Sequence, residues 1–307
     1  MGSNINFSVI IPHHNIPDML ERLLKSIPQR DDLEIILVDD HSDEEVVKRL
    51  QSIDRKNMTL VQTDECHGAG YARNCALPLA KGKWVLFADS DDFFNPGFDA
   101  FLSEYVDSDA DIVYFNANSV DTDTYEPSSR VDHLHDFIAE YQKDTERGGL
   151  VMRYLFTEPW CKMVKRNLIE HNGVRFEETI IRNDVRYSYL VGFYAKDIIV
   201  DNRQLYCVTT RQNSVSRGVG RQASLDELKV FAGWKHFLME HQISLPLAKF
   251  DLCLYNFTRH LWKDNALFRT EYGILREVGF GHTYILGQII KYLWKSVGYK
   301  MNVLFKS

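Results

Sequence analysis

Aspartates stand directly after two short apolar runs in the first third of the sequence. Asp39 and Asp40 end the first run, and Asp89 and Asp91, separated by one serine, follow the second. In open α/β sheets, ligands bind outside the carboxyl ends of the strands, which is where these side chains would lie. An Asp-x-Asp pair there can give oxygen ligands to a hard divalent cation that also binds water and phosphate. The alternative is that these aspartates are surface or helix-capping residues.

The elements that must position these side chains alternate along the first half of the chain. Continuous apolar runs, typical of strands buried on both faces, lie at 7–11, 34–38, 59–61, 84–87 and 112–115. Helical spacing of apolar residues predicts helices over 18–25, 43–50, 70–80 and 96–106. Strands that alternate with helices in this way predict βαβ units and a mostly parallel central sheet flanked by helices.

The second half is less regular. A polar stretch over 121–130 predicts a loop, and order returns from Val151. Further elements are expected as helices over 165–172 and from Asn183, and as strands over 198–200 and 205–208. Beyond about Arg217 the chain is mostly helical and aromatic. We therefore expect an α/β domain over 1–217 and a helical region over 218–307.

Composition excludes several classes of protein. The 307 residues are 45% hydrophobic and 26% charged, as in folded globular proteins, and the net charge of −7 argues against a nucleic-acid partner. Five widely spaced cysteines without a CxxC pair indicate neither a disulfide framework nor a zinc site, which favours a reducing, cytoplasmic location. We find no signal-peptide pattern and no uninterrupted apolar window of about 18 residues that would predict a spanning helix.

Several ordered segments resemble the motifs of family 2 glycosyltransferases with the GT-A fold. They lie at 9–15, 34–43, 68–74 and 89–92, with later acceptor-side segments at 160–164 and 176–184. The similarity covers roughly residues 5–215. It implies an inverting, metal-dependent enzyme that moves a sugar from a nucleotide-diphosphate sugar to a hydroxyl of a glycan or lipid-linked acceptor, in bacterial cell-surface polysaccharide synthesis.

The resemblance implies a nucleotide site in the first half of the chain. Pro12, His14, Asn15 and Asp40 match the positions that line the base and ribose in this family. A carboxylate can accept a hydrogen bond from N3–H of uracil, which favours a UDP-sugar as donor. The alternative for Asp40 and its neighbour Asp39 is capping of the helix that follows them.

The resemblance also implies a diphosphate and metal site that would hold Mg²⁺ or Mn²⁺. Asp91 matches the principal metal ligand, while Asp89 would approach the ribose or the metal, and Ser90 lies between them in the donor site. Arg73, expected in the first turn of its helix, could contact phosphate or brace the aspartates. An ion pair with a purely structural role is the alternative for this arginine.

Asp184 matches the carboxylate that serves as general base in inverting members of the family. A general base must take the proton of the acceptor hydroxyl while the anomeric carbon becomes cationic. Asp184 is expected at the start of a helix, with Asn183 as a cap, where the helix dipole favours the ionised form. The alternative is that Asp184 only caps this helix.

Four further residues are matched more weakly. Trp160 and Lys162 resemble an acceptor-side segment, although Trp160 next to a proline is equally well explained as a core residue. Ser214 and Arg217 lie in a segment that resembles a late loop able to close over the diphosphate.

The last thirty residues, 278–307, contain four lysines and no aspartate or glutamate. From Tyr284 onward, apolar residues recur at helical spacing beside these lysines, the composition of an interfacial amphipathic helix. This pattern predicts docking on the same chain or on the partner in a homodimer. Such a helix can also make peripheral contact with the inner face of the cytoplasmic membrane, which is the less favoured of the interpretations that this pattern allows.

Two other functions compete with glycosyl transfer. A nucleotidyltransferase also binds a nucleotide at this edge of a sheet, but it usually has a glycine-rich basic loop after the first strand, where this chain has residues 12–15. A non-catalytic protein that keeps the fold and binds nucleotide sugars is the other alternative. The presence of Asp40, Asp91 and Asp184 argues against it.

Overall fold

The computed structural model describes residues 5–211, 220–245 and 248–304. Contacts within the chain divide it into two compact units. The first, the α/β unit, comprises Met1–Thr179 and Asn183–Val215, and the second, the helical unit, comprises Ile180–Arg182 and Ser216–Ser307. The expected domain boundary between 217 and 218 falls outside the described residues and stays a prediction.

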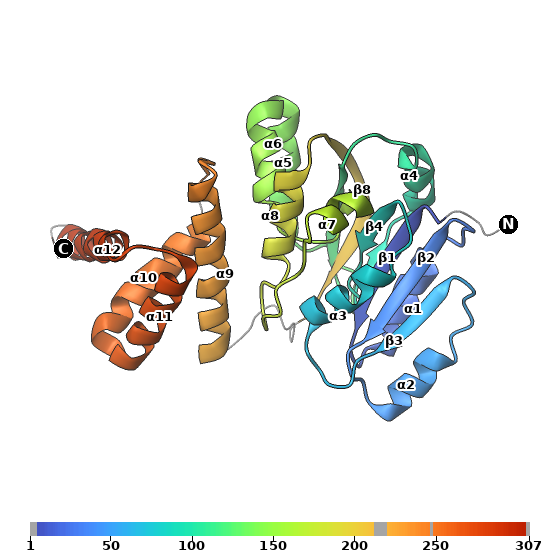
Figure 1. Ribbon diagram of the computed structural model, residues 1–307, viewed down its shortest axis with the longest axis horizontal. Coiled ribbons are helices and arrows are strands. Elements are labelled where there is room, and N and C mark those ends of the chain that lie inside the picture. The colour runs from blue at the N-terminus through green and yellow to red at the C-terminus, as the bar shows by residue number, and fades with distance from the viewer. Residues whose placement is uncertain (1–4, 212–219, 246–247, 305–307) are drawn as a thin grey trace. The chain divides into compact units, whose positions relative to one another are not determined.

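A single sheet forms the centre of the α/β unit (Figure 1). Within the described residues its strands run in the order β3-β2-β1-β4-β7-β6-β8-β5. Their bounds are β1 (Phe7–His13), β2 (Leu33–Asp39), β3 (Met58–Gln62), β4 (Trp84–Phe87), β5 (Phe93–Phe94), β6 (Ile112–Asp121), β7 (Lys162–Lys165) and β8 (Ile198–Thr210). The first four strands pair in parallel, as the sequence predicts, while β7 and β5 pair antiparallel with their neighbours. Every residue of β1 is buried, which explains its continuous apolar sequence.

The helices of the α/β unit begin and end close to the expected positions in its first half. Their bounds are α1 (Pro17–Ser26), α2 (Glu44–Gln51), α3 (Ala69–Ala76), the 3₁₀ turn η1 (Leu77–Leu79), α4 (Phe98–Tyr105), α5 (Asp132–Lys143), α6 (Thr145–Tyr154), α7 (Arg166–His171) and α8 (Val185–Tyr194). The fourth helix starts later than expected because Gly97 before it has φ +97°, outside the helical region. Helix α3 packs on β1 and β2 and carries part of the candidate site.

Two expectations for this unit are wrong. The predicted strands over 198–200 and 205–208 are one strand, β8, whose polar middle residues are exposed and so hide the strand in the sequence. Helices α5 and α6 were not expected, since two consecutive glycines in α6 are typical of a helix break. In the structure Gly148 permits close packing of these helices, because a Cβ there would lie 2.2 Å from the Cα of Tyr141.

The helical unit contains four long helices in the residues that the structure describes. They are α9 (Arg221–Glu240), α10 (Ala248–Lys263), α11 (Asn265–Val278) and α12 (His282–Leu304). Asp264 caps α11 through its carboxylate, and Gly279 ends that helix in a left-handed conformation with φ +118°. None of the described helices combines the length and apolar composition needed to cross a bilayer.

Candidate active site

Asp39 lies at the carboxyl end of β2, fully buried, and joins two loops of the α/β unit. Its Oδ1 is 3.0 Å from Nδ1 of His13 and 2.5 Å from the hydroxyl of Ser42. Burial would raise the pKa of Asp39, but the hydrogen bonds from His13 and Ser42 outweigh it and lower the pKa below its usual value. Asp39 is therefore an ionised anchor with its hydrogen-bonding capacity in use.

The carboxylate of Asp40 is bonded to one loop, which precedes α3. It accepts hydrogen bonds from the hydroxyl of Thr63, the thiol of Cys66 and the backbone N–H groups of His67 and Gly68. The weakest of these donors is the Cys66 thiol, 3.5 Å from Oδ2. The N-cap of α2 is Asp43, so the alternative that Asp40 or Asp39 caps this helix is wrong.

The turn after β1 lies beside Asp40. Pro12 is buried in the strand, while His14 is exposed and its Nδ1 is 2.8 Å from the backbone oxygen of Asp40. Asn15 has φ +55°, and its side-chain oxygen accepts a hydrogen bond from the N–H of Asp43. The structure thus places Pro12, His14 and Asn15 at the same edge of the sheet as Asp40.

The residues after β4 divide into exposed and buried side chains. Asp89 and Asp91 are 32% and 26% exposed, whereas Ser90 and Asp92 are buried. Asp92 accepts a hydrogen bond from the N–H of Thr209 on β8, and burial together with its acidic neighbours raises its pKa well above the usual value. Asp92 therefore holds β8 against this turn, and Asp89 and Asp91 are the two carboxylates that remain accessible.

Asp89 and Asp91 fit the requirements of a hard divalent cation. Burial, followed by the negative charge of Asp89, raises the pKa of Asp91 above its usual value. Two carboxylates leave the remaining positions of Mg²⁺ or Mn²⁺ to water and phosphate oxygens, which is how such ions bind beside nucleotides. No cluster of three or more metal-binding side chains occurs among the described residues.

Arg73 links Asp89 to Asn183, the residue before Asp184. Its guanidinium donates to Oδ1 of Asp89 at 2.6 Å and to the side-chain oxygen of Asn183 at 2.9 Å. Arg73 lies in the last turn of α3, so its expected place in the first turn is wrong, because the helix is short and begins at Ala69. The guanidinium is 95% buried and lies 5.2 Å from the ring centre of Phe176.

Asp184 directly precedes α8 but does not cap it through its side chain. Asp184 occupies the N-cap position of α8, but its carboxylate makes no capping hydrogen bond there. Burial, followed by the negative charge of Glu158, raises the pKa of Asp184 to about 6. A carboxylate with that pKa is ionised at neutral pH and is still basic enough to take a proton.

The segment before β7 forms the wall beside Asp184. Lys162 is fully buried, and its ammonium donates to the backbone oxygens of Phe156 and Glu158, while burial lowers its pKa to about 7. Trp160 is also buried, and its ring stacks on Tyr206 at 5.4 Å between centres. The core alternative for Trp160 is confirmed, and Lys162 supports the backbone of this wall.

Sequence reasoning missed three charged residues at this site. Arg211 lies with Nη2 3.4 Å from Oδ2 of Asp91, and the guanidinium of Arg22 donates to the backbone oxygen of Asp91. Glu158 pairs with His133 at 3.0 Å and is near enough to Asp184 to affect its pKa. Arg22 lies on α1, Glu158 precedes β7 and Arg211 follows β8, so no common motif in the sequence marks them. The predicted residues Ser214 and Arg217 lie outside the described residues.

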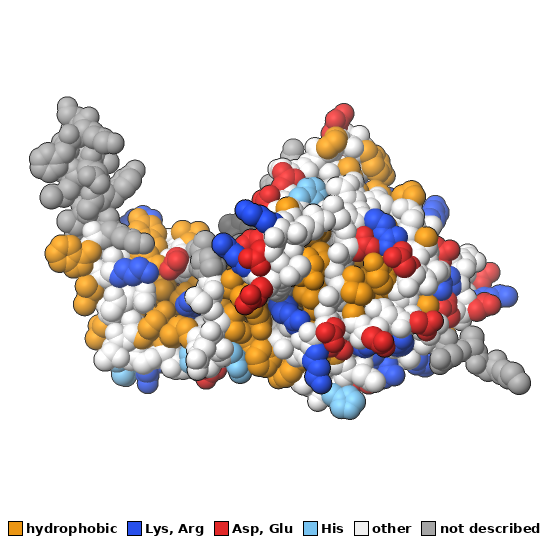
Figure 2. All heavy atoms as spheres, turned by 90° about the horizontal axis from the view of Figure 1, so that it is seen from above, with side chains coloured by type: hydrophobic (Ala, Val, Ile, Leu, Met, Phe, Trp, Pro, Cys, Tyr) orange, Lys and Arg blue, Asp and Glu red, His pale blue; other side chains and the backbone are white. Residues whose placement is uncertain are grey.

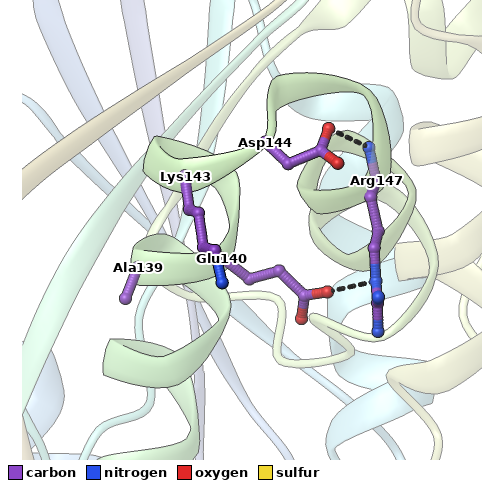
Figure 3. Close-up of a pocket in the computed structure, with 5 residues that line it drawn as sticks. All are labelled: Ala139, Glu140, Lys143, Asp144 and Arg147. Atoms are coloured by element: carbon purple, nitrogen blue, oxygen red, sulfur yellow. Dashed lines mark hydrogen bonds and ion pairs between the residues drawn. The ribbon is translucent and has the colours of Figure 1, made fainter.

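Two cavities lie away from this site. Figure 3 shows the first, of about 370 Å³ between α5 and α6, where Arg147 pairs with Glu140 at 2.6 Å and Asp144 caps α6. The second, of about 620 Å³, is lined by residues of α1, of α2 and of the loops that follow them. Neither is lined by Asp40, Asp91 or Asp184.

Comparisons with known proteins agree with this geometry. The chain is 34% identical over 89 residues to the Escherichia coli UDP-Glc:alpha-D-GlcNAc-diphosphoundecaprenol beta-1,3-glucosyltransferase WfaP, a match that covers 28% of this chain and 36% of that protein. This match and the matches to two other curated relatives cover only part of those proteins. The covered shares are 36% of WfaP and 65% and 31% of the other two.

Two solved structures share the fold. The structure of Staphylococcus aureus TarS in complex with UDP-GlcNAc aligns with a TM-score of 0.58 at 18% identity, over 92% of this chain and 93% of that one. Mannosyltransferase PcManGT from Pyrobaculum calidifontis, in complex with GDP-Man and Mn²⁺, aligns with a TM-score of 0.51 at 16% identity, over 96% and 80% of the chains. The sequence model described as glycosyl transferase family 2 matches residues 8–173, more than half of the chain. The chain therefore belongs to glycosyltransferase family 2 and has the GT-A fold, with a helical C-terminal region.

Proposed function

We propose that this protein is an inverting, metal-dependent glycosyltransferase that moves a sugar from a UDP-sugar to a hydroxyl of a glycan or lipid-linked acceptor in cell-surface polysaccharide synthesis. One observation carries the proposal. Arg73 joins Asp89, in the candidate metal and donor site, to Asn183, the residue before the candidate base. A single buried guanidinium thus ties the two groups that sugar transfer must bring together.

In the proposed reaction, Asp184 takes the proton of the acceptor hydroxyl as the hydroxyl oxygen bonds to the anomeric carbon. The bond between that carbon and the diphosphate oxygen breaks, and the electron pair leaves with UDP. Attack on the face opposite the leaving group inverts the anomeric configuration. The raised pKa of Asp184 suits this role, because a base with a pKa near neutrality can accept a proton at physiological pH.

The donor would be held at the carboxyl ends of β1, β2 and β4. Asp89 and Asp91 would hold Mg²⁺ or Mn²⁺, which neutralises charge on the departing diphosphate. Pro12, His14 and Asn15 would line the base. Because the carboxylate of Asp40 already has four donors, a uracil N3–H would replace the weakest of them, the Cys66 thiol. The UDP-GlcNAc bound to TarS and the UDP-Glc in the name of WfaP favour a uridine donor.

The helical unit would bring the enzyme to its acceptor at the inner face of the cytoplasmic membrane. On α12, Leu286, Ile290 and Trp294 follow one another at four-residue spacing and are 53%, 55% and 74% exposed. Figure 2 shows hydrophobic side chains exposed on this unit. Lysines flank this stripe in a segment without acidic residues, which suits an anionic lipid surface. The diphosphoundecaprenol in the name of WfaP is a lipid-linked acceptor.

Titration calorimetry tests the donor site without the acceptor. We expect UDP to bind with Mn²⁺ present and to bind at least tenfold more weakly without it, whereas GDP binds more weakly in both cases. Asp91→Ala should remove the effect of Mn²⁺, and Asp136→Ala, at an exposed aspartate on α5, should leave it unchanged. Binding of neither nucleotide would contradict the proposal. Release of pyrophosphate rather than UDP from nucleotide sugars would indicate a nucleotidyltransferase.

Vesicle flotation tests the membrane contact. We expect Ile290→Glu together with Trp294→Glu to abolish binding to vesicles that contain anionic lipid, with Leu79→Glu, at an exposed leucine of the α/β unit, as the control. Wild-type protein that fails to float would contradict membrane contact. If the same double variant instead turned a dimer into a monomer in ultracentrifugation, this helix face would be a homodimer interface.

A further inference from the structure

Asp184 follows a seven-residue loop whose two ends are fixed in the α/β unit. The N–H of Glu177 donates to the backbone oxygen of Asn183 at 3.1 Å and closes the loop. Helix α3 packs tightly on this closure, since a Cβ on Gly70 would lie 2.1 Å from the backbone oxygen of Glu177. Arg73 on the same helix bonds to the side chain of Asn183. The ends of the loop are thus held on the side of the donor site.

The tip of this loop, Ile180–Arg182, belongs to the helical unit. The N–H of Ile180 donates to the carboxylate of Asp226 on α9 at 3.2 Å. Arg182 pairs with the next residue of that helix, because its Nη2 is 3.1 Å from Oε1 of Glu227 and its Nε is 3.2 Å from the same oxygen. The guanidinium also lies 5.9 Å from the ring centre of Phe231, one turn further along α9.

Arg182 adopts a backbone conformation that needs support. Its φ is +62°, in the left-handed region that residues other than glycine rarely adopt. Such conformations are energetically costly and persist where surrounding contacts fix them. The contacts of Arg182 are those with α9, two residues before Asp184 in the chain.

From this geometry we propose that Glu227, through Arg182, positions the base Asp184 for the transfer step. Glu227 is a positioning residue, since it acts on the loop rather than on the substrate. The helical unit then contributes to turnover by holding the loop tip, besides any contact that it makes with a membrane. The inference rests on the proposed role of Asp184 as general base.

A charge exchange tests this inference. Arg182→Glu and Glu227→Arg should each lower kcat about tenfold, because small displacements of a catalytic group cost rate, while UDP and Mn²⁺ binding and the KM for the donor stay unchanged. The double variant, which restores an ion pair with the charges reversed, should recover most of the lost kcat. Glu240→Gln on the same helix, which removes only the pair with His236, is the matched control and should keep the wild-type kcat.

The outcomes separate this inference from the proposed function. If Asp184→Asn is inactive while both single variants keep the wild-type kcat, the positioning role is wrong and the base role stands. If the single variants lose kcat and the double variant does not recover it, the residues stabilise the helical unit rather than position the base, which also overturns the inference. Full turnover by Asp184→Asn would overturn the base role and, with it, the inference.

Discussion

Asp39 ends β2 and Asp184 precedes α8, and the surroundings of these two carboxylates shift their pKa values in opposite directions. Hydrogen bonds from His13 and Ser42 lower the pKa of Asp39 against the effect of burial. Asp184 has no side-chain bond to its helix, and burial together with the charge of Glu158 raises its pKa to about 6. The same residue type is thus held as an anion at Asp39, while at Asp184 its pKa suits the proposed role of proton acceptor.

The two carboxylates differ because the surrounding hydrogen-bond donors are gathered around Asp39 and Asp40 rather than around Asp184. Asp39 and Asp40 are bonded to the loops around them and so hold those loops in place. Around Asp184, charged groups are held near one another with fewer donors, which is typical of groups with shifted pKa values at functional sites. We therefore expect variants of Asp39, in the proposed donor half, to lose stability, and variants of Asp184, in the proposed acceptor half, to lose turnover.

The largest expected effect is on turnover at Asp184. Asp184→Asn removes the proton acceptor while nearly preserving shape, and we expect kcat to fall by about 10²–10⁴-fold, the usual contribution of a general base. Binding of UDP and Mn²⁺ should stay within about twofold, because Asp184 is not among the residues proposed to hold the nucleotide or the metal. Steady-state kinetics and calorimetry measure both quantities, with Asp136→Asn as the control. Parallel loss of binding and turnover would remove the proposed division between the halves.

A second variant tests the close contact that holds the loop before Asp184. Gly70→Ala should destabilise the fold by about 1–3 kcal/mol, since the added Cβ would lie 2.1 Å from the backbone oxygen of Glu177. Gly233→Ala is the matched control, because Gly233 is in helix α9 with no atom within 4 Å of the added Cβ, and it should stabilise by about 0.5–1 kcal/mol. Urea unfolding measures both. Equal effects of the two substitutions would contradict the predicted close packing.

Asp39→Asn should affect stability rather than chemistry. Removing the charge that His13 and Ser42 share should cost about 1–3 kcal/mol at neutral pH. The folded-state pKa of Asp39 is lowered, so its contribution is present above the unfolded-state value of 3.8 and is lost as the pH falls through the folded-state value. The free-energy difference between wild type and variant, measured by urea unfolding, should therefore shrink below about pH 4. A difference that grows on acidification would disprove the assignment.

The smallest expected effect is a shift in pH dependence. The rate should rise with pH through about 6 as Asp184 loses its proton. Glu158→Gln removes a negative charge that raises this pKa, so the acidic limb should move to lower pH by up to about one unit. Arg73 and Asp89 also act on Asp184 and are unchanged in this variant. The pH profile of kcat checks the prediction, and a shift to higher pH would contradict it.

Much of the fold follows from local patterns. The buried runs of β1, β2 and β4 and the amphipathic α1 and α2 were predicted because their periodicity reports burial directly. Strand β8 was divided in two because its exposed middle is polar, and α6 was missed because its glycines serve close packing against α5. In both cases a tertiary contact outweighs the local preference.

The sequence by itself determined the sheet edge at which the aspartates gather, because parallel strands end together and the motifs follow those ends directly. Only the tertiary structure decided what each carboxylate does there. It brings Arg73 between Asp89 and Asn183, buries Asp92 against β8 and places Glu158 near Asp184. The physical reason is that the pKa of a carboxylate depends on burial and on neighbouring charges, and those neighbours are distant in the sequence.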